Sequence, residues 1–293
     1  MNVGFIGLGR MGEPMARKML AGGHSLFVHD VSGEACQALA ADGAERLDSP
    51  AGIAARADIV LTSLPGPREV EAVMMGAHGV FTTVRQNAIV VDTSTVGPSL
   101  SQQMARRFSE KDASYLDGPV SGGQEGAAAG TLTVMVGGDE GAFERARPIL
   151  SLIGSNLYYM GPSGSGNAVK LIVQMIYLSY VAVFCEGLSL GEKIGIPFDR
   201  FLEVLANSSA GRPGIEKRYE MLKENDLTPR FEIDLGLKDL ALALEICVKY
   251  HQAPVVTQAA SDAYQRAKQL GLGGKDLTAL RVLDRDLLGK KTN

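Results

Sequence analysis

Val3-Gly-Phe-Ile-Gly-Leu-Gly-Arg-Met-Gly12 is a short apolar stretch that runs directly into a loop with three glycines. Gly7, Gly9 and Gly12 have the spacing G-x-G-x-x-G, and a helical pattern follows from Met11 to Ala21. The first glycine permits a tight turn, the second lets a ligand approach the backbone, and the third lets the helix pack on the strand. Free amides at the start of that helix would bind a diphosphate. The stretch therefore predicts the first strand–helix unit of an α/β domain that binds a dinucleotide.

The second predicted strand, Ser25–Asp30, ends on a carboxylate 18 residues after Gly12. An acidic side chain at this position accepts hydrogen bonds from the hydroxyl groups of the adenosine ribose and repels a 2′-phosphate. No Arg or Lys lies between Val31 and Ala44 to bind that phosphate. The segment therefore favours NAD over NADP and leaves NADP as a possible second cofactor. The alternative is that the glycines serve packing alone and that Asp30 is a solvated strand end.

The first half of the chain alternates short apolar runs with helical patterns. Runs of Val, Ile and Leu separated by helices are typical of a mainly parallel sheet covered on both faces. The predicted strands are Val3–Ile6, Ser25–Asp30, Ile59–Ser63, Ala88–Asp92, Tyr115–Asp117, Thr131–Val136 and Leu157–Tyr159. The predicted helices include Met11–Ala21, Gly33–Asp42, Pro98–Lys111 and Glu140–Leu150. We expect an α/β domain over residues 1–162.

The alternation of strand and helix patterns ends at the Gly- and Pro-rich segment Gly161-Pro-Ser-Gly-Ser-Gly166, which disfavours regular secondary structure. One long helical pattern follows from Asn167 to Ile194, and no strand pattern recurs after it. The further predicted helices are Phe198–Ala206, Ile215–Lys223, Leu235–Tyr250, Val255–Leu270 and Leu277–Asp286. We therefore expect an all-helical second domain over residues 163–293, joined to the first through the long helix.

Composition and charge exclude several classes of protein. The chain has 293 residues, 45% hydrophobic and 21% charged, which is ordinary globular composition. Its net charge of −4 and its lack of a basic block argue against nucleic-acid binding. Cys36, Cys185 and Cys247 are odd in number and far apart, so buried thiols are expected rather than disulfides or a zinc site. The four histidines show no metal-ligand spacing, and no metal is expected.

Localisation is expected to be cytoplasmic. A strand pattern begins at Asn2 and the glycine loop follows at once, which leaves no room for a targeting peptide before it. The longest apolar run, Leu171–Phe184, has 14 residues, whereas a bilayer span needs about 20. This run is therefore interpreted as a buried helix, and no membrane partner is expected.

The segment Asp117-Gly-Pro-Val-Ser-Gly-Gly123 is the first of two that carry chemistry. A strand ends, Pro119 sets a turn, and Ser121 with two glycines leads into a short alanine-rich helix. Successive amides at such a helix start form a small anion cradle suited to a carboxylate. A glycine-rich turn without a ligand explains the same spacing, so both interpretations stay open here.

The second segment is Gly164-Ser-Gly-Asn-Ala-Val-Lys170-Leu-Ile-Val-Gln174. Lys170 is expected in the first turn of an otherwise apolar helix, where a cation is disfavoured by the helix dipole. Gln174 follows one turn later on the same side. A lysine and an amide paired on one face at a domain junction could hold a substrate oxygen.

Together these pieces resemble the β-hydroxyacid dehydrogenase family, which includes 3-hydroxyisobutyrate dehydrogenases, tartronate semialdehyde reductases and glyoxylate/succinic semialdehyde reductases. The resemblance covers the whole chain. The matching motifs are the glycine loop, Val91-Asp-Thr-Ser-Thr95, Gly118-Pro-Val-Ser-Gly-Gly123, Gly166-Asn-Ala-Val-Lys170 and Leu237-Lys-Asp-Leu-Ala-Leu-Ala243. The resemblance implies a Rossmann domain, a long helix, an all-α domain, and a homodimer or homotetramer that transfers hydride between NAD(P) and a small β-hydroxyacid or its semialdehyde.

The resemblance also implies roles for individual residues. Lys170 would be the catalytic acid/base. The residues implied to bind the substrate are Ser121, Gly122, Gly123, Gln174 and Asp239. The residues implied to bind the cofactor are Gly7, Leu8, Gly9, Arg10, Met11, Gly12, Asp30, Leu64, Pro65, Thr95, Phe231 and Lys238. Of these, Phe231, Lys238 and Asp239 would come from the second domain.

One departure bears on the substrate. Many family members have Asn three residues after the lysine, where this chain has Val173, and Gln174 supplies an amide one position later. Arg212 could bind a second anionic group or cap a loop. Two other functions compete with hydroxyacid oxidation: an imine reductase on the same fold, which Lys170 argues against, and a cofactor-binding sensor without turnover.

Overall fold

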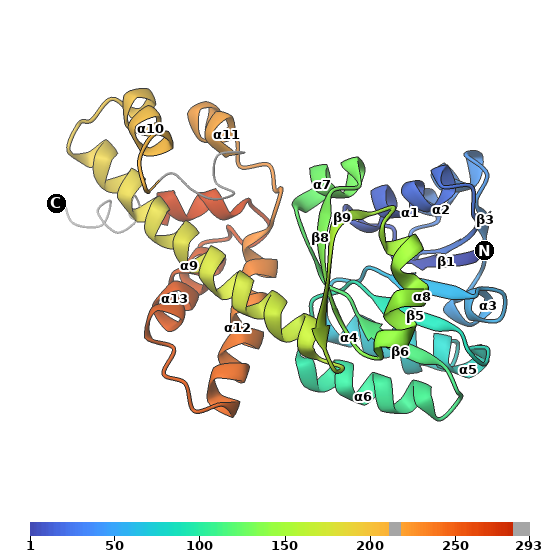
Figure 1. Cartoon of the computed structure of the whole chain (residues 1–293). Coiled ribbons are helices and arrows are strands. Elements are labelled where there is room, and N and C mark those ends of the chain that lie inside the picture. Colours follow the sequence, from blue (N-terminus) through green and yellow to red (C-terminus); the bar gives the residue numbers. More distant parts are fainter. Residues whose placement is uncertain (211–217, 284–293) are drawn as a thin grey trace. The chain divides into compact units, whose positions relative to one another are not determined.

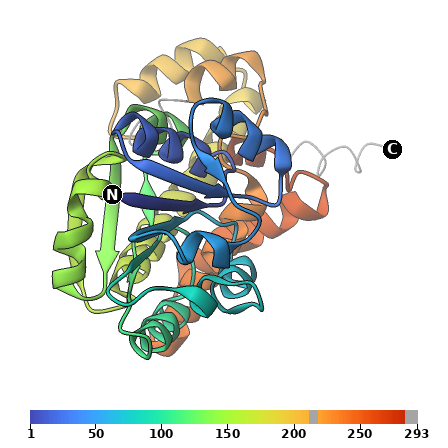
Figure 2. The same ribbon diagram turned by 90° about the vertical axis from the view of Figure 1, so that its right-hand side faces the viewer.

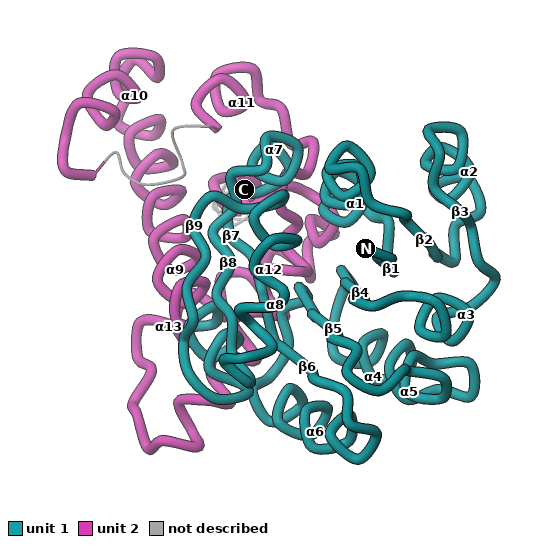
Figure 3. Tube along the Cα trace, turned by 45° about the vertical axis from the view of Figure 1, so that its right-hand side comes forward, with its two compact units in different colours: residues 1–171 teal, residues 172–293 magenta. Residues whose placement is uncertain are grey.

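The computed structural model describes residues 1–210 and 218–283. The chain divides into two compact units, Met1–Leu171 and Ile172–Asn293 (Figures 1 and 3). Each unit has its own hydrophobic core. The division falls inside the long helix that begins at Ser165, beyond the glycine-rich segment where the sequence placed it. Hydrogen bonds described below tie the first turn of this helix to the first unit.

The first unit is built on a nine-stranded sheet with the order β3-β2-β1-β4-β5-β6-β8-β7, and β9 pairs with β8. The strands are β1 Asn2–Ile6, β2 Ser25–His29, β3 Glu45–Arg46, β4 Ile59–Thr62, β5 Ile89–Asp92, β6 Ser114–Asp117, β7 Val120–Ser121, β8 Leu132–Gly137 and β9 Gly154–Gly161. Only β8 pairs antiparallel, with β6 and β7. The predicted mainly parallel sheet is therefore confirmed.

Helices lie on both faces of this sheet (Figure 2). They are α1 Gly12–Ala21, α2 Gly33–Ala41, α3 Pro50–Ala54, α4 Pro67–Met75, α5 Val80–Thr83, α6 Pro98–Ser109, α7 Gly123–Ala129 and α8 Glu140–Leu150. Every residue of β4 and β5 is buried, because successive side chains enter cores on opposite faces. Strands β3 and β7 were not predicted, since a two-residue strand is too short to show a period.

The second unit is helical in its described part, as predicted. Its elements are α9 Ser165–Lys193, α10 Phe198–Ala206, α11 Tyr219–Glu224, α12 Ile233–Lys249, α13 Val255–Gln269 and the 3₁₀ helix η2 Leu277–Val282. Tyr264 is the largest fully buried side chain of its core. The helix predicted over Leu277–Asp286 is present in its described part and is a 3₁₀ helix over Leu277–Val282, beginning with the bond from Ala279 N to Asp276 O. Part of the predicted helix Ile215–Lys223 lies outside the described residues, and α11 begins at Tyr219.

Two opposite faces of α9 have different environments. By length and composition alone, α9 could cross a membrane. One face is buried in the core of the second unit, as in the core helix of a soluble protein. The opposite face is exposed and mainly apolar, with the charged Glu186 among its residues. It includes Ile172, Ile176, Val183 and Leu190, which together we call the α9 stripe.

Candidate active site

The three glycines between β1 and α1 differ in what surrounds them. Gly7 has a φ of +90°, and a Cβ there would lie 2.3 Å from Ser63 O. A Cβ on Gly12 would lie 1.9 Å from Gly7 O, so strand and helix are in contact only because this residue is glycine. Apart from Gly9 and its two chain neighbours, no atom in the described part of the chain lies within 4 Å of the position that a Cβ on Gly9 would take. The loop therefore has open space over its middle glycine, where a bound diphosphate would fit.

Asp30 follows β2 and is held beside this loop by two backbone hydrogen bonds. Leu8 N donates to Asp30 Oδ2 at 2.6 Å, and Ser32 N donates to Oδ1 at 2.7 Å. A cavity of about 410 Å³ opens next to them. It is lined by Leu8, Gly9, Arg10, Glu13, Ser32, Glu34, Ala35 and Ala38. The carboxylate thus has a fixed orientation at the end of the strand, as recognition of a ribose requires.

The ends of β4 and β5 are joined by a buried polar network that the sequence did not reveal. Leu64 N donates to Ser94 Oγ at 2.9 Å, and Ser94 N donates to Asp92 Oδ1 at 3.0 Å. The fully buried Asp92 also accepts from Thr62 Oγ1 at 2.8 Å and Tyr115 OH at 2.9 Å. Burial raises the pKa of Asp92, and its hydrogen bonds oppose that shift. The network fixes the backbone that carries Leu64, Pro65 and Thr95.

Ser121 ends β7, where it pairs with Thr133 of β8. Gly122 and Gly123 have φ values of +136° and +68°, which are accessible to glycine and strained for other residues. The two glycines turn the chain from the strand directly into α7. The helix start expected after Ser121 is present.

Asp117, the last residue of β6, caps the start of α9 from 47 and 50 residues away. Its Oδ1 accepts from Gly164 N at 2.7 Å and its Oδ2 accepts from Asn167 N at 2.9 Å. Burial raises the pKa of this carboxyl to about 6. A Cβ on Gly166 would lie 2.3 Å from Met135 O, so only glycine permits this close approach of helix and sheet.

Asn167 makes the second connection between α9 and the sheet. Its Oδ1 accepts from Val96 N at 3.0 Å, and its Nδ2 donates to Ser101 Oγ at 3.1 Å. Lys170 follows on the same helix and is 7% exposed. Since α9 begins at Ser165, two residues before the predicted start, Lys170 lies in its second turn and not in the first turn as expected. The sequence motifs contained Asp117 and Asn167 but gave no sign of their partners, which are far away in the chain.

The second unit brings three of the predicted residues together. Gln174 Nε2 donates to Asp239 Oδ2 at 2.6 Å, and both side chains are buried. Lys238 Nζ lies 3.1 Å from Asp239 Oδ1 and forms an ion pair with it. The amide of α9 and the two charged residues of α12 therefore form one cluster.

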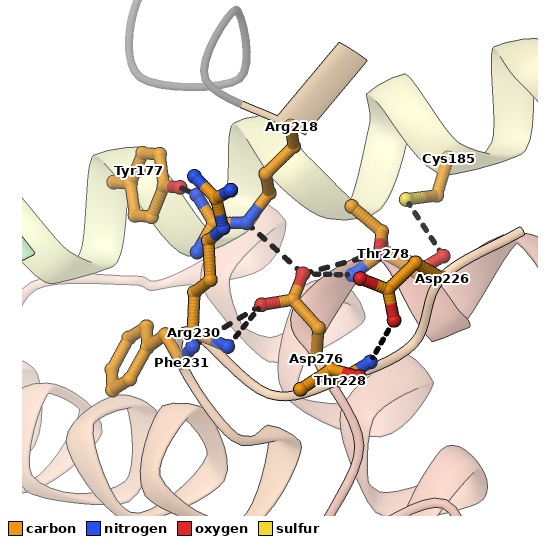
Figure 4. Close-up of polar contacts among 9 residues, drawn as sticks. All are labelled: Tyr177, Cys185, Arg218, Asp226, Thr228, Arg230, Phe231, Asp276 and Thr278. Carbon is orange, nitrogen blue, oxygen red and sulfur yellow. Dashed lines mark hydrogen bonds and ion pairs between the residues drawn. The ribbon is translucent and has the colours of Figure 1, made fainter. Parts of the chain in front are cut away.

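Phe231 precedes α12 and is held by a buried carboxylate that sequence reasoning missed (Figure 4). The fully buried Asp276 accepts from the backbone N of Arg230 and of Phe231, both at 3.1 Å. It also pairs with Arg218 Nε at 3.0 Å, and Arg218 Nη1 donates to Tyr177 OH at 2.7 Å. Tyr177 belongs to α9, so one carboxylate links that helix to the segment before α12.

The predicted site residues therefore fall into two groups. The first unit holds Gly7, Leu8, Gly9, Arg10, Met11, Gly12, Asp30, Leu64, Pro65, Thr95, Ser121, Gly122, Gly123 and Lys170. The second unit holds Gln174, Phe231, Lys238 and Asp239. Arg212 lies outside the described residues.

Comparisons with known families cover nearly the whole chain. A family described as the NAD binding domain of 6-phosphogluconate dehydrogenase matches residues 2–161. A second, described as the NAD-binding domain of NADP-dependent 3-hydroxyisobutyrate dehydrogenase, matches residues 164–283. Each of the two units thus corresponds to one family.

Individual relatives extend over the same length. The chain is 38% identical over 279 residues to 2-(hydroxymethyl)glutarate dehydrogenase of Eubacterium barkeri, which covers 95% of this chain and 93% of the relative. It is 35% identical to 3-sulfolactaldehyde reductase of Escherichia coli (strain K12), with 95% and 94% covered.

Solved structures of related proteins also match the chain over nearly its whole length. A 3-hydroxyisobutyrate dehydrogenase from Salmonella typhimurium has a TM-score of 0.89 at 30% identity, covering 95% of this chain and 98% of that one. Psf3, solved with NADP⁺, has a TM-score of 0.87 at 25% identity, covering 96% and 99%. An imine reductase from Pseudomonas sp. has a TM-score of 0.63 at 17% identity over 96% and 98%, a likeness that shows the fold alone.

Proposed function

The chain belongs to the β-hydroxyacid dehydrogenase family, and we propose that it transfers hydride between NAD(P) and a small β-hydroxyacid or its semialdehyde, with Lys170 as the acid/base. The observation that carries the proposal is the similarity to hydroxyacid dehydrogenases and aldehyde reductases along the whole chain. The buried lysine at the start of α9 supports the assignment of the proton-transfer group.

The cofactor would be held by the residues at the carboxyl ends of the parallel strands. Open space over Gly9 and the oriented Asp30 carboxylate fit the diphosphate and the adenosine ribose. Leu64, Pro65 and Thr95 would lie along the rest of the molecule. When bound, the nicotinamide supplies or accepts the hydride. Because of Asp30, we expect a lower KM for NAD than for NADP.

Lys170 would move the proton that accompanies the hydride. In oxidation its neutral amine takes the proton of the substrate hydroxyl, and in reduction its ammonium donates a proton to the aldehyde oxygen. The contacts of Asp117 and Asn167 with the start of α9 restrict the movement of the helix that carries this side chain.

The substrate carboxylate would bind at Ser121, Gly122 and Gly123, where two glycines lead the backbone into α7. Gln174 and Asp239 would orient the substrate oxygen, and their hydrogen bond sets the direction of both polar groups. Phe231 and Lys238 would complete the binding of the cofactor from the second unit.

We also propose a soluble, cytoplasmic homo-oligomer in which the α9 stripe contacts a second copy. Ile176 and Val183 are 63% and 60% exposed, and a row of large apolar side chains on one helix face is costly to leave in water. Ile176, Val183 and Leu190 recur every seven residues, as in a helix that packs on a partner helix.

An activity panel tests the function. The substrates are 3-hydroxyisobutyrate, serine, glycerate, tartronate semialdehyde, succinic semialdehyde and glyoxylate, each assayed with NAD(H) and NADP(H) in the matching direction. Cyclic imines are assayed beside them. Turnover of a hydroxyacid or semialdehyde supports the proposal, whereas turnover of imines alone assigns the chain to imine reduction. Cofactor binding without any turnover indicates a sensor.

A further inference from the structure

A basic residue, Arg46, lies near the adenosine end of the proposed cofactor site, just beyond the segment Val31–Ala44 of the sequence. We infer that Arg46 lets this site accept the 2′-phosphate of NADP as a second cofactor beside NAD. This inference rests on the proposed function, because it concerns the same nucleotide site. The sequence from Val31 to Ala44 contains no Arg or Lys, and Arg46 reaches the site only through the pairing of β3 with β2.

The register of the two strands places Arg46 on the same face as Asp30. Arg46 pairs with Val28 in parallel, and paired residues on neighbouring strands point to the same face of a sheet. Val28 lies in the core beneath α1 and α2, and Asp30 is two residues further along the same strand path. Side chains two residues apart share a face. Arg46 therefore extends from the neighbouring strand toward the region of the Asp30 carboxylate.

The guanidinium of Arg46 lies against the start of α2. A Cβ built on Gly33 would lie 3.5 Å from one of its terminal nitrogens and 3.8 Å from the other. Gly33 comes directly after Ser32, whose backbone N donates to Asp30. The absence of a side chain at position 33 leaves the guanidinium next to the turn that follows the ribose-binding carboxylate.

Arg46 is exposed, and within residues 1–210 and 218–283 it forms no hydrogen bond or ion pair. In contrast, the nearby Arg56 is paired with Glu45. An arginine fork matches the oxygens of a phosphate and binds them through two charge-assisted hydrogen bonds. Arg46 has its donors available for such a ligand.

The negatively charged groups near this position favour binding of NAD over binding of NADP. Glu13 and Glu34 line the cavity beside the glycine loop and, together with the adjacent Asp30, oppose a 2′-phosphate, while Arg10 and Arg46 favour it. Because Asp30 also accepts hydrogen bonds from the free ribose hydroxyls, NAD binds better. Arg46 offsets part of the repulsion, so NADP binds more weakly and is still used.

Calorimetric titrations with four ligands test this inference without turnover: NAD, NADP, 5′-ADP and 2′,5′-ADP. Arg46→Ala should weaken binding of NADP and 2′,5′-ADP by about tenfold or more, which corresponds to at least about 1.4 kcal/mol. Binding of NAD and 5′-ADP should change by less than about twofold. Arg46→Lys should recover part of the loss, because it restores the charge but not the fork.

The matched control is Arg106→Ala, which removes another exposed arginine, from α6, and should leave all four affinities unchanged. Equal affinities of Arg46→Ala and the wild type for the two phosphorylated ligands would overturn the inference. If the wild type binds NAD but neither 2′-phosphate ligand, the inference also fails while the proposed function stands. If the wild type binds none of the four, the proposed function fails with it.

Discussion

At the scale of single residues, Lys170 is the group whose removal should affect chemistry more than binding. We expect Lys170→Ala or Lys170→Met to lower kcat by roughly 10²–10⁴-fold, the usual contribution of general acid–base catalysis. The affinity for NAD should change by less than about tenfold, because the glycine loop and Asp30 are untouched. Steady-state kinetics on the best substrate and calorimetry with NAD measure the two effects.

The control for this variant is a thermal melt, which must match that of the wild type. A folded Lys170→Ala enzyme with wild-type kcat would contradict the assignment. The proton donor would then have to be another group, with Tyr177 and Asp239 as the next candidates.

Asp117 should make the stability of the protein depend on pH in a direction unusual for a carboxylate. Its pKa rises from 3.8 to about 6 on folding, so the folded protein binds this proton more tightly than the unfolded chain does. The stabilisation is complete below about pH 4 and is lost as the pH rises through about 6.

Asp117→Asn removes this titration. The unfolding free energy of the wild type minus that of Asp117→Asn should therefore fall between pH 4 and pH 7, by up to about 3 kcal/mol. Urea denaturation at four pH values across this range measures the difference. A difference in unfolding free energy that stays constant with pH, or one that rises with pH, would contradict this prediction.

At the scale of elements, the loop between β1 and α1 contains one glycine needed for binding, Gly9, and another needed for folding, Gly12. Gly9→Ala should raise the Kd for NAD by about tenfold or more, because its Cβ enters the open space of the diphosphate. Its melting temperature should stay close to that of the wild type, since no atom of the described residues, apart from Gly9 and its two chain neighbours, lies within 4 Å of that Cβ.

Gly12→Ala is the matched control in the same loop. Its Cβ would lie 1.9 Å from Gly7 O, so this variant should melt at a clearly lower temperature. Calorimetry and thermal melts of both variants test the contrast. Unchanged NAD affinity in Gly9→Ala would mean that the open space does not receive the diphosphate.

At the scale of the whole molecule, the α9 stripe should determine the oligomeric state. Val183→Asp places a charge on its exposed apolar face and should convert the oligomer to monomers, because burying an unpaired carboxylate costs several kcal/mol. Light scattering coupled to gel filtration at micromolar concentration measures the mass. Val204→Asp, on an equally exposed position of α10, should keep the wild-type mass. A wild-type protein that is itself a stable monomer would refute the proposal.

Much of the fold could be predicted from the sequence alone. Buried parallel strands such as β4 and β5 are continuous runs of Ile, Val and Leu, and α10 begins and ends where its pattern does. The glycine loop is recognisable because its three roles are local and have fixed spacing. The family resemblance assigned roles to Ser121 and Lys170, which their local segments had already singled out. It also added residues that composition and periodicity do not identify, namely Leu64, Pro65, Thr95, Phe231, Lys238 and Asp239.

The partners of these residues were decided only by the tertiary structure. Asp117 caps α9 across 47 and 50 residues, Asp276 holds Phe231 from 45 residues away, and Arg46 lies beside Gly33 through the short strand β3. Periodicity reports which face of an element is buried, because burial acts on every residue of that face. It does not report which distant residue completes a hydrogen bond, since that pairing depends on how the sheet brings the ends of separate strands together.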